Sequence, residues 1–225
     1  ERVDAAGAVL RPLSASETED AAAQLKAAGV KAVAICFLHA YRNPAHERQA
    51  REIVERVFPE ALISLSSDVL PEFREYERVS TTAVNAYVGP RMSAYLNRFV
   101  ERVGRLGVKP APFIVHSNGG MLPAPVAEQF PVRTCLSGPA AGVVGAAAVA
   151  RAAGAPDILA FDVGGTSTDV SLVTGGAPLF TSDRLVAGHP VKTPAIDVNA
   201  IGAAGGSIAW IDDAGVLKVG PKSAG

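Results

Sequence analysis

The stretch FDVGGTSTDV, residues 161–170, decides the fold of this chain. Apolar residues on both sides predict two β-strands, at 158–163 and 169–174, and the glycine and hydroxyl residues between them predict a tight turn. An aspartate borders each side of the turn, at Asp162 and Asp169. The pattern indicates an apolar hairpin that keeps two carboxylates beside a flexible bend.

Such a turn has the composition of a phosphate cradle. Gly164 and Gly165 let a ligand approach the backbone N–H groups, and the hydroxyls of residues 166–168 add donors. Two carboxylates repel a phosphate, but Mg²⁺ bridges carboxylate and phosphate oxygens. The stretch therefore favours a Mg-nucleotide site. The alternative is an ordinary hairpin whose aspartates are bonded internally.

Three further loops combine glycine with hydroxyl or amide residues beside predicted strands. They are HSNGG (116–120), SGPAAG (137–142, at the start of a small-residue helix) and IGAAGGS (201–207). One such loop is weak evidence, since glycine is common in turns. Several at strand ends indicate one cleft lined by backbone.

The rest of the sequence alternates helices and strands and predicts an α/β fold with a mixed sheet and flanking helices. A capping-box pattern, Ser16 with Glu19, predicts the start of a helix. The apolar runs 30–38 and 61–66 predict buried strands.

Two segments in the middle of the chain carry further predictions. Residues 78–106 predict two helices separated at Gly89-Pro90, because proline interrupts helices. The apolar run 131–136 predicts a strand. Gly175-Gly176 predicts an antiparallel turn into 177–182.

Composition bounds the class of protein. The chain has 225 residues, 48% of them hydrophobic, and a net charge of −1. It can bury a substantial core, and no global field draws it to nucleic acid or an anionic membrane. No apolar run is long enough for a transmembrane helix, and no signal-peptide pattern begins the chain. The start at Glu1 instead of Met suggests an internal piece of a longer protein.

The cysteines and histidines add little chemistry. Cys36 and Cys135 lie in apolar runs, which favours reduced thiols over a disulfide and fits a cytoplasmic protein. The four histidines lack zinc-ligand spacing. His116, at a predicted strand end, is the one histidine considered for the cleft, although a packing role is favoured.

Five motifs of this chain resemble those of a known protein family. FDVGGTSTDVSLV resembles the second phosphate motif of the actin-like ATPase superfamily, whose fold is ribonuclease H-like. Taken with EYERVSTTAVNAYVGP (75–90), HSNGGM, SGPAAGVVGAA and DVNAIGAAGGSIAWID, the chain looks like the hydantoinase A/5-oxoprolinase family. That family includes N-methylhydantoinase and acetone and acetophenone carboxylase subunits. The likeness would make residues 1–68 the end of the family's N-terminal domain and 69–225 an incomplete hydantoinase A domain.

The resemblance implies an ATP and Mg²⁺ site. Asp162 would hold Mg²⁺, and Asp169 would anchor the turn or a metal-bound water; both are the candidate catalytic residues. The candidate nucleotide-binding residues are Gly164, Gly165, Thr166, Ser167, Asn118, Gly119, Gly120, Ser137, Gly138, Gly205, Gly206 and Ser207.

The implied activity is ATP-dependent opening of a cyclic amide, hydantoin or 5-oxoproline, through phosphorylation of the amide. A second, B-type subunit or domain would complete it, and this piece alone would be inactive because the superfamily's first phosphate motif is absent from it. The alternatives are a ketone carboxylase subunit, a sugar or acid kinase, and a non-catalytic nucleotide-binding or scaffold domain. Two departures bear on the substrate: Asn199 replaces a family histidine, and Ala204 replaces a family glycine where a positive φ would strain alanine.

Overall fold

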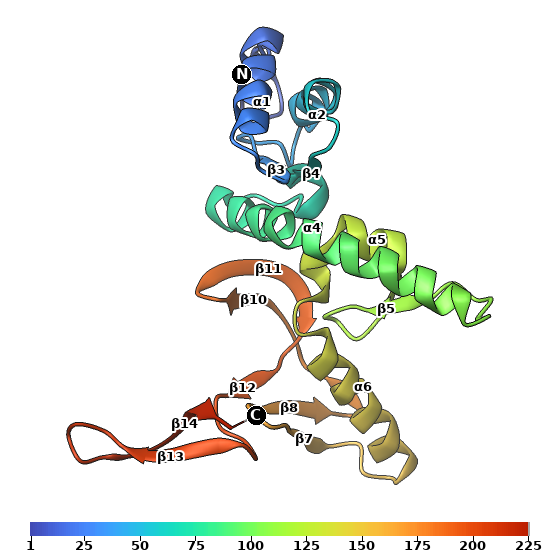
Figure 1. The fold of residues 1–225 in the computed structure, drawn as a ribbon, viewed down its shortest axis with the longest axis vertical. Helices are drawn as coiled ribbons and strands as arrows, with labels where there is room; N and C mark the ends of the chain where they lie inside the picture. Colours follow the sequence, from blue (N-terminus) through green and yellow to red (C-terminus); the bar gives the residue numbers. More distant parts are fainter. Residues whose placement is uncertain (225) are drawn as a thin grey trace. The chain divides into compact units, whose positions relative to one another are not determined.

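The computed structural model describes residues 1–224, which divide into two compact units (Figure 1). The first unit comprises residues 1–114, 122–134 and 182–193. The second comprises residues 115–121, 135–181 and the chain from 194 onward. Helices accompany both parallel and antiparallel strand pairs, so the predicted α/β class with mixed pairing is confirmed.

The first unit is built around a parallel pair, β3 (Ala32–Ile35) and β4 (Leu62–Leu65). Helices α1 (Ala15–Ala27) and α2 (Ala45–Val57) lie on one side of this pair and α4 (Glu75–Arg105) on the other (Figure 1). The buried core on the α1–α2 side includes Ala22, Val33, Val54 and Leu65. This unit also contains β1 (Arg2–Val3), β2 (Val9–Arg11), α3 (Ser66–Val69), α5 (Ala124–Gln129), the 3-10 helix η1 (Pro131–Thr134) and most of a strand pair at residues 182–193.

The predicted cap of the first helix is wrong. Helix α1 begins after Ser14, whose hydroxyl accepts a hydrogen bond from the N–H of Glu17 at 3.3 Å. Residues 16 and 19 therefore lie inside the helix. The pattern Ser14–Glu17 satisfies the same capping rule two residues earlier.

The predicted break at Gly89-Pro90 is also wrong, because α4 runs through Pro90 as one helix. A proline inside a helix costs about 3 kcal/mol. Ala86 and Leu96, before and after the proline, are both buried. Tertiary packing on both sides of the proline outweighs the lost hydrogen bond.

The strand predicted at 131–136 is wrong as well, since residues 131–134 form η1. Pro131 has no N–H to donate to a strand ladder, and the N–H of Val132 donates to Oδ1 of Asn85 at 3.2 Å. Leu136 then takes a left-handed conformation, with φ of 60°, immediately before the next helix.

The buried side of α4 is polar. Arg78 donates to the carbonyl of Phe37 at 2.7 Å and to that of Glu72 at 3.1 Å. Asn85 donates to Ser64 Oγ at 3.0 Å and to the carbonyl of Gln129 at 3.2 Å. The motif at 75–90 thus ties strand β4 and helix α5 to one helix.

The second unit contains an antiparallel sheet in the order β12-β8-β7, with β9 also paired to β8. Its strands are β7 (Ile158–Val163), β8 (Thr168–Thr174), β9 (Ala177–Pro178) and β12 (Asn199–Ile201). The predicted hairpin around 161–170 and the Gly175-Gly176 turn are confirmed.

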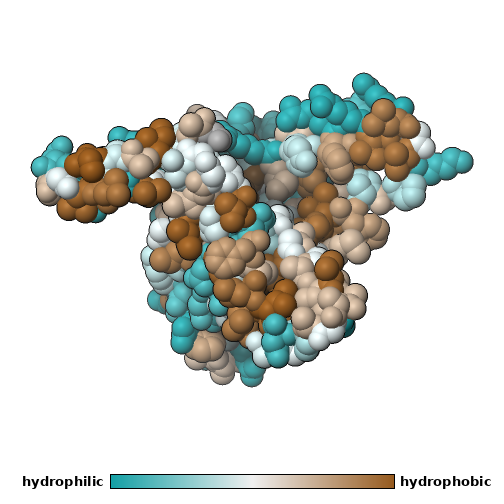
Figure 2. All heavy atoms as spheres, turned by 90° about the horizontal axis from the view of Figure 1, so that it is seen from below, coloured by the Kyte–Doolittle hydropathy of each residue, from teal (hydrophilic) through white to brown (hydrophobic). Residues whose placement is uncertain are grey.

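Helix α6 (Ser137–Ala152) covers one face of this sheet. Its Ala140, Val143 and Ala147 pack against Val173 of β8, with Ile158 of β7 at the edge of the cluster. The other face is uncovered within residues 1–224: Leu159, Phe161 and Val163 are 57–61% exposed. Figure 2, which views the structure from below, shows several hydrophobic patches among hydrophilic residues on this side.

Three strand pairs complete the described structure. They are β5 (Phe113–Val115) with β6 (Met121–Pro123), β10 (Phe180–Val186) with β11 (His189–Ile196), and β13 (Ser207–Ile211) with β14 (Leu217–Ser223). Within residues 1–224, neither Cys36 nor Cys135 takes part in a disulfide, in line with the prediction. No helix within residues 1–224 is both long and apolar enough to cross a membrane.

Candidate functional site

The two candidate catalytic carboxylates are direct neighbours. Asp162 of β7 lies opposite Asp169 of β8 in the antiparallel register. Both belong to the sheet face that α6 covers, and a Cβ on Gly142 of α6 would lie 3.8 Å from Oδ2 of Asp162. Burial, and then the charge of Asp162, raise the pKa of Asp169. Two acids at this position make the site attractive for a cation.

The turn between the strands keeps three backbone donors available. The N–H of Gly164 donates to the carbonyl of Ser167 at 3.0 Å and closes the turn. The N–H groups of Gly165, Thr166 and Ser167 have no acceptor among the described residues. Gly165 and Thr166 are also exposed. The turn therefore presents three successive amides to an anion, and a nest of this kind binds phosphate.

The loop at 201–207 lies directly against this turn. The N–H of Gly205 donates to the carbonyl of Gly164 at 3.1 Å, and that of Gly206 donates to the carbonyl of Gly165 at 2.8 Å. Ser207 is bonded within the loop, where its hydroxyl accepts from the N–H of Ala204 at 2.7 Å. The loop is thus brought to the predicted site, but its amides hold the turn and do not point to a ligand.

Thr168 fastens the same loop from the side of the sheet. Its hydroxyl donates to the carbonyl of Ala203 at 2.8 Å, and the residue is buried. The hydroxyl predicted as a possible phosphate donor is therefore already in use. The turn and the loop form one hydrogen-bonded assembly, which keeps the amides of residues 165–167 in place.

Ser137 and Gly138 form the first turn of α6, a helix of 16 residues. Leu136 is its N-cap and provides no side-chain cap, so the first N–H groups are left for another acceptor. A Cβ on Gly138 would meet nothing within 4 Å, which means that the space in front of this turn is open. A free helix N-terminus of this length attracts anions.

The loop at 116–120 has a different character. Its backbone N–H groups are used internally: that of Asn118 donates to Nδ1 of His116 and that of Gly120 to Oδ1 of Asn118, both at 2.9 Å. Gly119 has φ of +81°, and a Cβ there would lie 2.5 Å from Cγ2 of Val144 on α6. The loop packs on α6, which explains its glycine without a ligand.

The two departures from the family pattern lie in ordinary surroundings. Asn199 is exposed on β12, where it pairs with Val170. Ala204 is not among the residues with positive φ, so the expected strain at this alanine is absent. His116 is buried and accepts the N–H of Asn118, which gives it the packing role favoured above.

The residues present fit a magnesium ion, although they do not form a complete cage. No group of three or more His, Cys, Asp and Glu side chains within residues 1–224 is placed to hold a metal. Magnesium usually takes one or two carboxylates and completes its shell with water and phosphate oxygens. Asp162 and Asp169 provide that number of carboxylates beside a phosphate-type turn.

Comparison with known proteins gives matches over the whole chain. A family described as Hydantoinase/oxoprolinase matches residues 78–225, and its N-terminal region matches residues 1–58. Caprolactamase subunit alpha from Pseudomonas jessenii is 37% identical over all of this chain and 32% of its own length. The acetophenone carboxylase gamma subunit from Aromatoleum aromaticum is 33% identical over all of this chain and 31% of its own length.

Solved structures give the same picture. The crystal structure of ATP-dependent caprolactamase from Pseudomonas jessenii matches with a TM-score of 0.87 at 37% identity, over all of this chain and 32% of that one. A nucleotide-free structure of acetone carboxylase matches with a TM-score of 0.85 at 31% identity, over all of this chain and 32% of that one. The chain spans about a third of the length of the relatives it matches.

Proposed function

Because the chain belongs to the hydantoinase/oxoprolinase family, we propose that it provides the phosphate-binding part of an ATP-dependent cyclic-amide hydrolase. The observation that carries this proposal is the set of three unoccupied amides at residues 165–167 beside Asp162 and Asp169. A related protein is named ATP-dependent caprolactamase, which is an ATP-dependent hydrolase of a cyclic amide.

The chemistry explains why ATP is needed. The amide of a lactam is stabilised by resonance and is a poor electrophile. Transfer of the γ-phosphoryl group to the amide oxygen forms an O–P bond and releases ADP. Water then adds to the activated carbon, phosphate leaves, and cleavage of the C–N bond gives an amino acid. The net reaction consumes one lactam, one ATP and water.

Phosphoryl transfer depends on positioning and charge stabilisation more than on a nucleophile. The amides of Gly165, Thr166 and Ser167 would bind phosphate oxygens, with Gly164 closing the turn behind them. Gly205, Gly206 and Ser207 would act as supports, since their own hydrogen bonds hold the turn. The free N-terminus at Ser137 and Gly138 would face the same anion.

Asp162 would hold Mg²⁺, and Asp169 would hold a metal-bound water or the turn. The ion, when bound, would neutralise charge that develops on the phosphate oxygens. The loop of Asn118, Gly119 and Gly120 would not contact the nucleotide. It would support the site by packing on α6, where Gly119 lies against Val144.

A ketone carboxylase subunit is the second candidate, favoured by the acetophenone and acetone carboxylase relatives. Phosphorylation would then trap an enolate in place of an amide. The relatives are named as subunits, which supports a partner chain or domain for this one. We also propose that the family's two domains meet near residue 68 and that residues 1–225 alone are inactive.

Calorimetry with Mg-ATP on the complete protein tests the proposal. Asp162→Ala should weaken Mg-ATP binding and abolish ATP turnover that a lactam stimulates. Asp213→Ala is the matched control, because Asp213 is exposed in the β13–β14 turn, outside the site. Equal affinity and turnover in Asp162→Ala and the parent would refute the proposal. Phosphate transfer to a hydroxyl without ring opening would indicate a kinase instead.

A further inference from the structure

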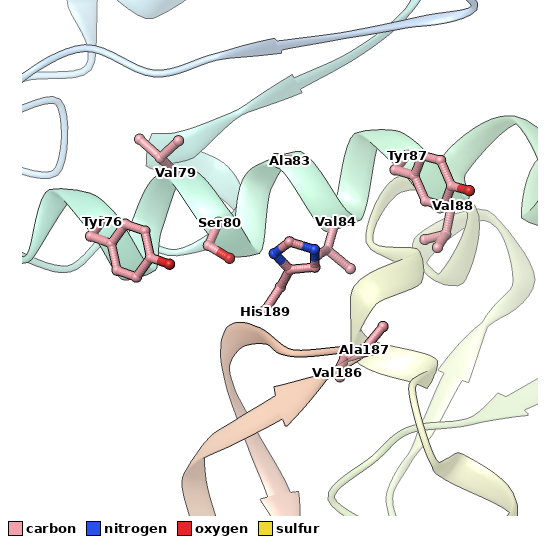
Figure 3. A pocket seen from close by; sticks show the side chains of 10 residues that line it. All are labelled: Tyr76, Val79, Ser80, Ala83, Val84, Tyr87, Val88, Val186, Ala187 and His189. Carbon is pink, nitrogen blue, oxygen red and sulfur yellow. The ribbon is translucent and has the colours of Figure 1, made fainter.

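The exposed side of the motif at 75–90 has no part in the proposed phosphate site, but it lines a cavity. The cavity lies in the first unit, between α4 and the tip of the β10–β11 hairpin, and has a volume of about 580 Å³ (Figure 3). It is lined by Tyr76, Val79, Ser80, Ala83, Val84, Tyr87, Val88, Val186, Ala187 and His189. Cavities of this size hold small organic ligands.

The two walls of the cavity, helix α4 and the β10–β11 hairpin, are joined by a hydrogen bond and an ion pair. The backbone N–H of Lys192 on β11 donates to Oγ1 of Thr81 on α4 at 2.9 Å. The ammonium group of Lys192 lies 2.9 Å from a carboxylate oxygen of Glu72, just before the helix. These two contacts keep the hairpin beside α4 in the absence of a ligand.

The tip of the hairpin is held in an unusual conformation. Ala187 has φ of 50° and Gly188 has φ of 82°. Two consecutive positive φ values are typical of a tight hairpin turn, and an alanine there is strained. This turn presents Ala187 and His189 to α4, which is where the cavity is. Strain of this kind often accompanies a binding surface.

The lining is apolar with a small polar centre. Among residues 1–224, no Asp, Glu, Lys or Arg side chain lines the cavity. In Figure 3 the hydroxyl of Ser80 and the ring of His189 point toward each other from opposite walls, and Tyr76 and Tyr87 stand toward the two ends. The imidazole of His189 makes no hydrogen bond with another described residue, although its strand pairs with β10. An apolar surface with a hydroxyl and an imidazole in the middle suits an apolar ligand that carries one hydrogen-bond acceptor.

We propose that this cavity binds the substrate, and that the substrate is a neutral apolar carbonyl compound, either a lactam or an aryl ketone. Its hydrocarbon part would contact Val79, Val84 and Val186, and its carbonyl oxygen would accept a hydrogen bond from Ser80 or His189. The assignment of this ligand as the substrate rests on the proposed function. We expect no binding of a substrate with a carboxylate, such as 5-oxoproline, because its charge would lie against a mostly apolar lining with no Lys or Arg beside it.

Ligand-observed NMR on the complete protein without nucleotide tests the proposal, with caprolactam, acetophenone and 5-oxoproline as probes. We expect saturation transfer to caprolactam or acetophenone and none to 5-oxoproline. Ala83→Leu fills the cavity from an exposed helix position and should raise the Kd of the bound probe about tenfold or more. Ala94→Leu, at an exposed α4 position outside the cavity, is the matched control and should leave the Kd unchanged.

A second, smaller substitution keeps the proposal testable if Ala83→Leu does not fold. Ser80→Ala removes only the hydroxyl and should raise the Kd about threefold to tenfold, the range for one lost hydrogen bond. Circular dichroism should show that each variant keeps its helix content. Binding of 5-oxoproline as tight as that of caprolactam, or a Kd that Ala83→Leu leaves unchanged, would overturn the proposal. Because no ATP is present, either result is independent of the Asp162→Ala measurement.

Discussion

Asp162 and Asp169 face each other across the β7–β8 pair, and the second of them carries a raised pKa. Burial is the first cause of this shift and the charge of Asp162 is the second. Asp162→Asn should therefore move the pKa of Asp169 down toward its usual value in the metal-free protein. A ¹³C NMR titration of the aspartate carboxyl groups measures this, with Asp213→Asn as the control.

The same shift gives stability a pH dependence of known sign. A carboxyl with a raised pKa holds its proton in the folded protein at pH values where the unfolded chain has lost it. Its contribution to the free energy of unfolding therefore falls as pH rises from the unfolded pKa through the folded pKa. Above that range, metal-free Asp169→Asn should be more stable than the parent in urea unfolding. No difference there would contradict the cause given for the shift.

Gly119 should not tolerate a side chain. Gly119→Ala would place a Cβ 2.5 Å from Cγ2 of Val144 and 3.0 Å from Cδ1 of Ile196, at a φ of +81°. Overpacking and positive φ together predict a loss of about 2–4 kcal/mol in the free energy of unfolding. Gly145→Ala, also on α6 but with nothing within 4 Å, should instead stabilise by about 0.5–1 kcal/mol. Equal effects of the two changes would show that the loop does not pack as described.

Glu47 is a buried carboxylate that holds three segments together. It accepts from the N–H of Phe37 at 2.9 Å, the hydroxyl of Ser66 at 2.5 Å and the N–H of Ser67 at 2.9 Å. Glu47→Gln replaces an acceptor oxygen with a donor and should destabilise by about 2–4 kcal/mol. Glu52→Gln, exposed on the same helix, should stay within about 0.5 kcal/mol of the parent. Chemical denaturation measures both.

Cys36 should be an unreactive thiol. Burial, and then the charge of Glu47, raise its pKa to about 11. At pH 8 the folded protein therefore holds almost no thiolate at this position, and the thiolate is the nucleophile. Alkylation by iodoacetamide, followed by mass spectrometry, should be far slower at Cys36 in the folded protein than in urea. Fast modification in the folded state would show that the side chain is accessible and ionised.

Local sequence rules were enough for the hairpin at 161–170, since both strands, the turn and the partner strand β9 follow from apolar runs and glycines. They also located the glycine loops. What they missed is which backbone groups are already bonded. The amides of Gly205 and Gly206 look as free in the sequence as those of Gly165 and Thr166, and only the fold shows that the former hold the turn.

The errors share a cause, which is that distant contacts decided the local structure. Pro90 stays inside a helix because Ala86 and Leu96 are buried on both sides of it. Residues 131–134 leave the strand conformation because Asn85, far away in sequence, takes the N–H of Val132. The cavity beside α4 was also beyond sequence reasoning, because its second wall comes from residues 186–189.

Strand β7 is the outermost strand of its sheet, and Leu159, Phe161 and Val163 leave one of its faces to water. The free edge of an outermost strand beside an exposed apolar face is a template for β-strand pairing between molecules. Residues 1–225, expressed alone, should therefore self-associate as the protein concentration rises. The substitution Phe161→Lys should keep this chain monomeric at the same concentrations. A longer expressed chain that covers the exposed face of β7 should therefore be less prone to association than residues 1–225.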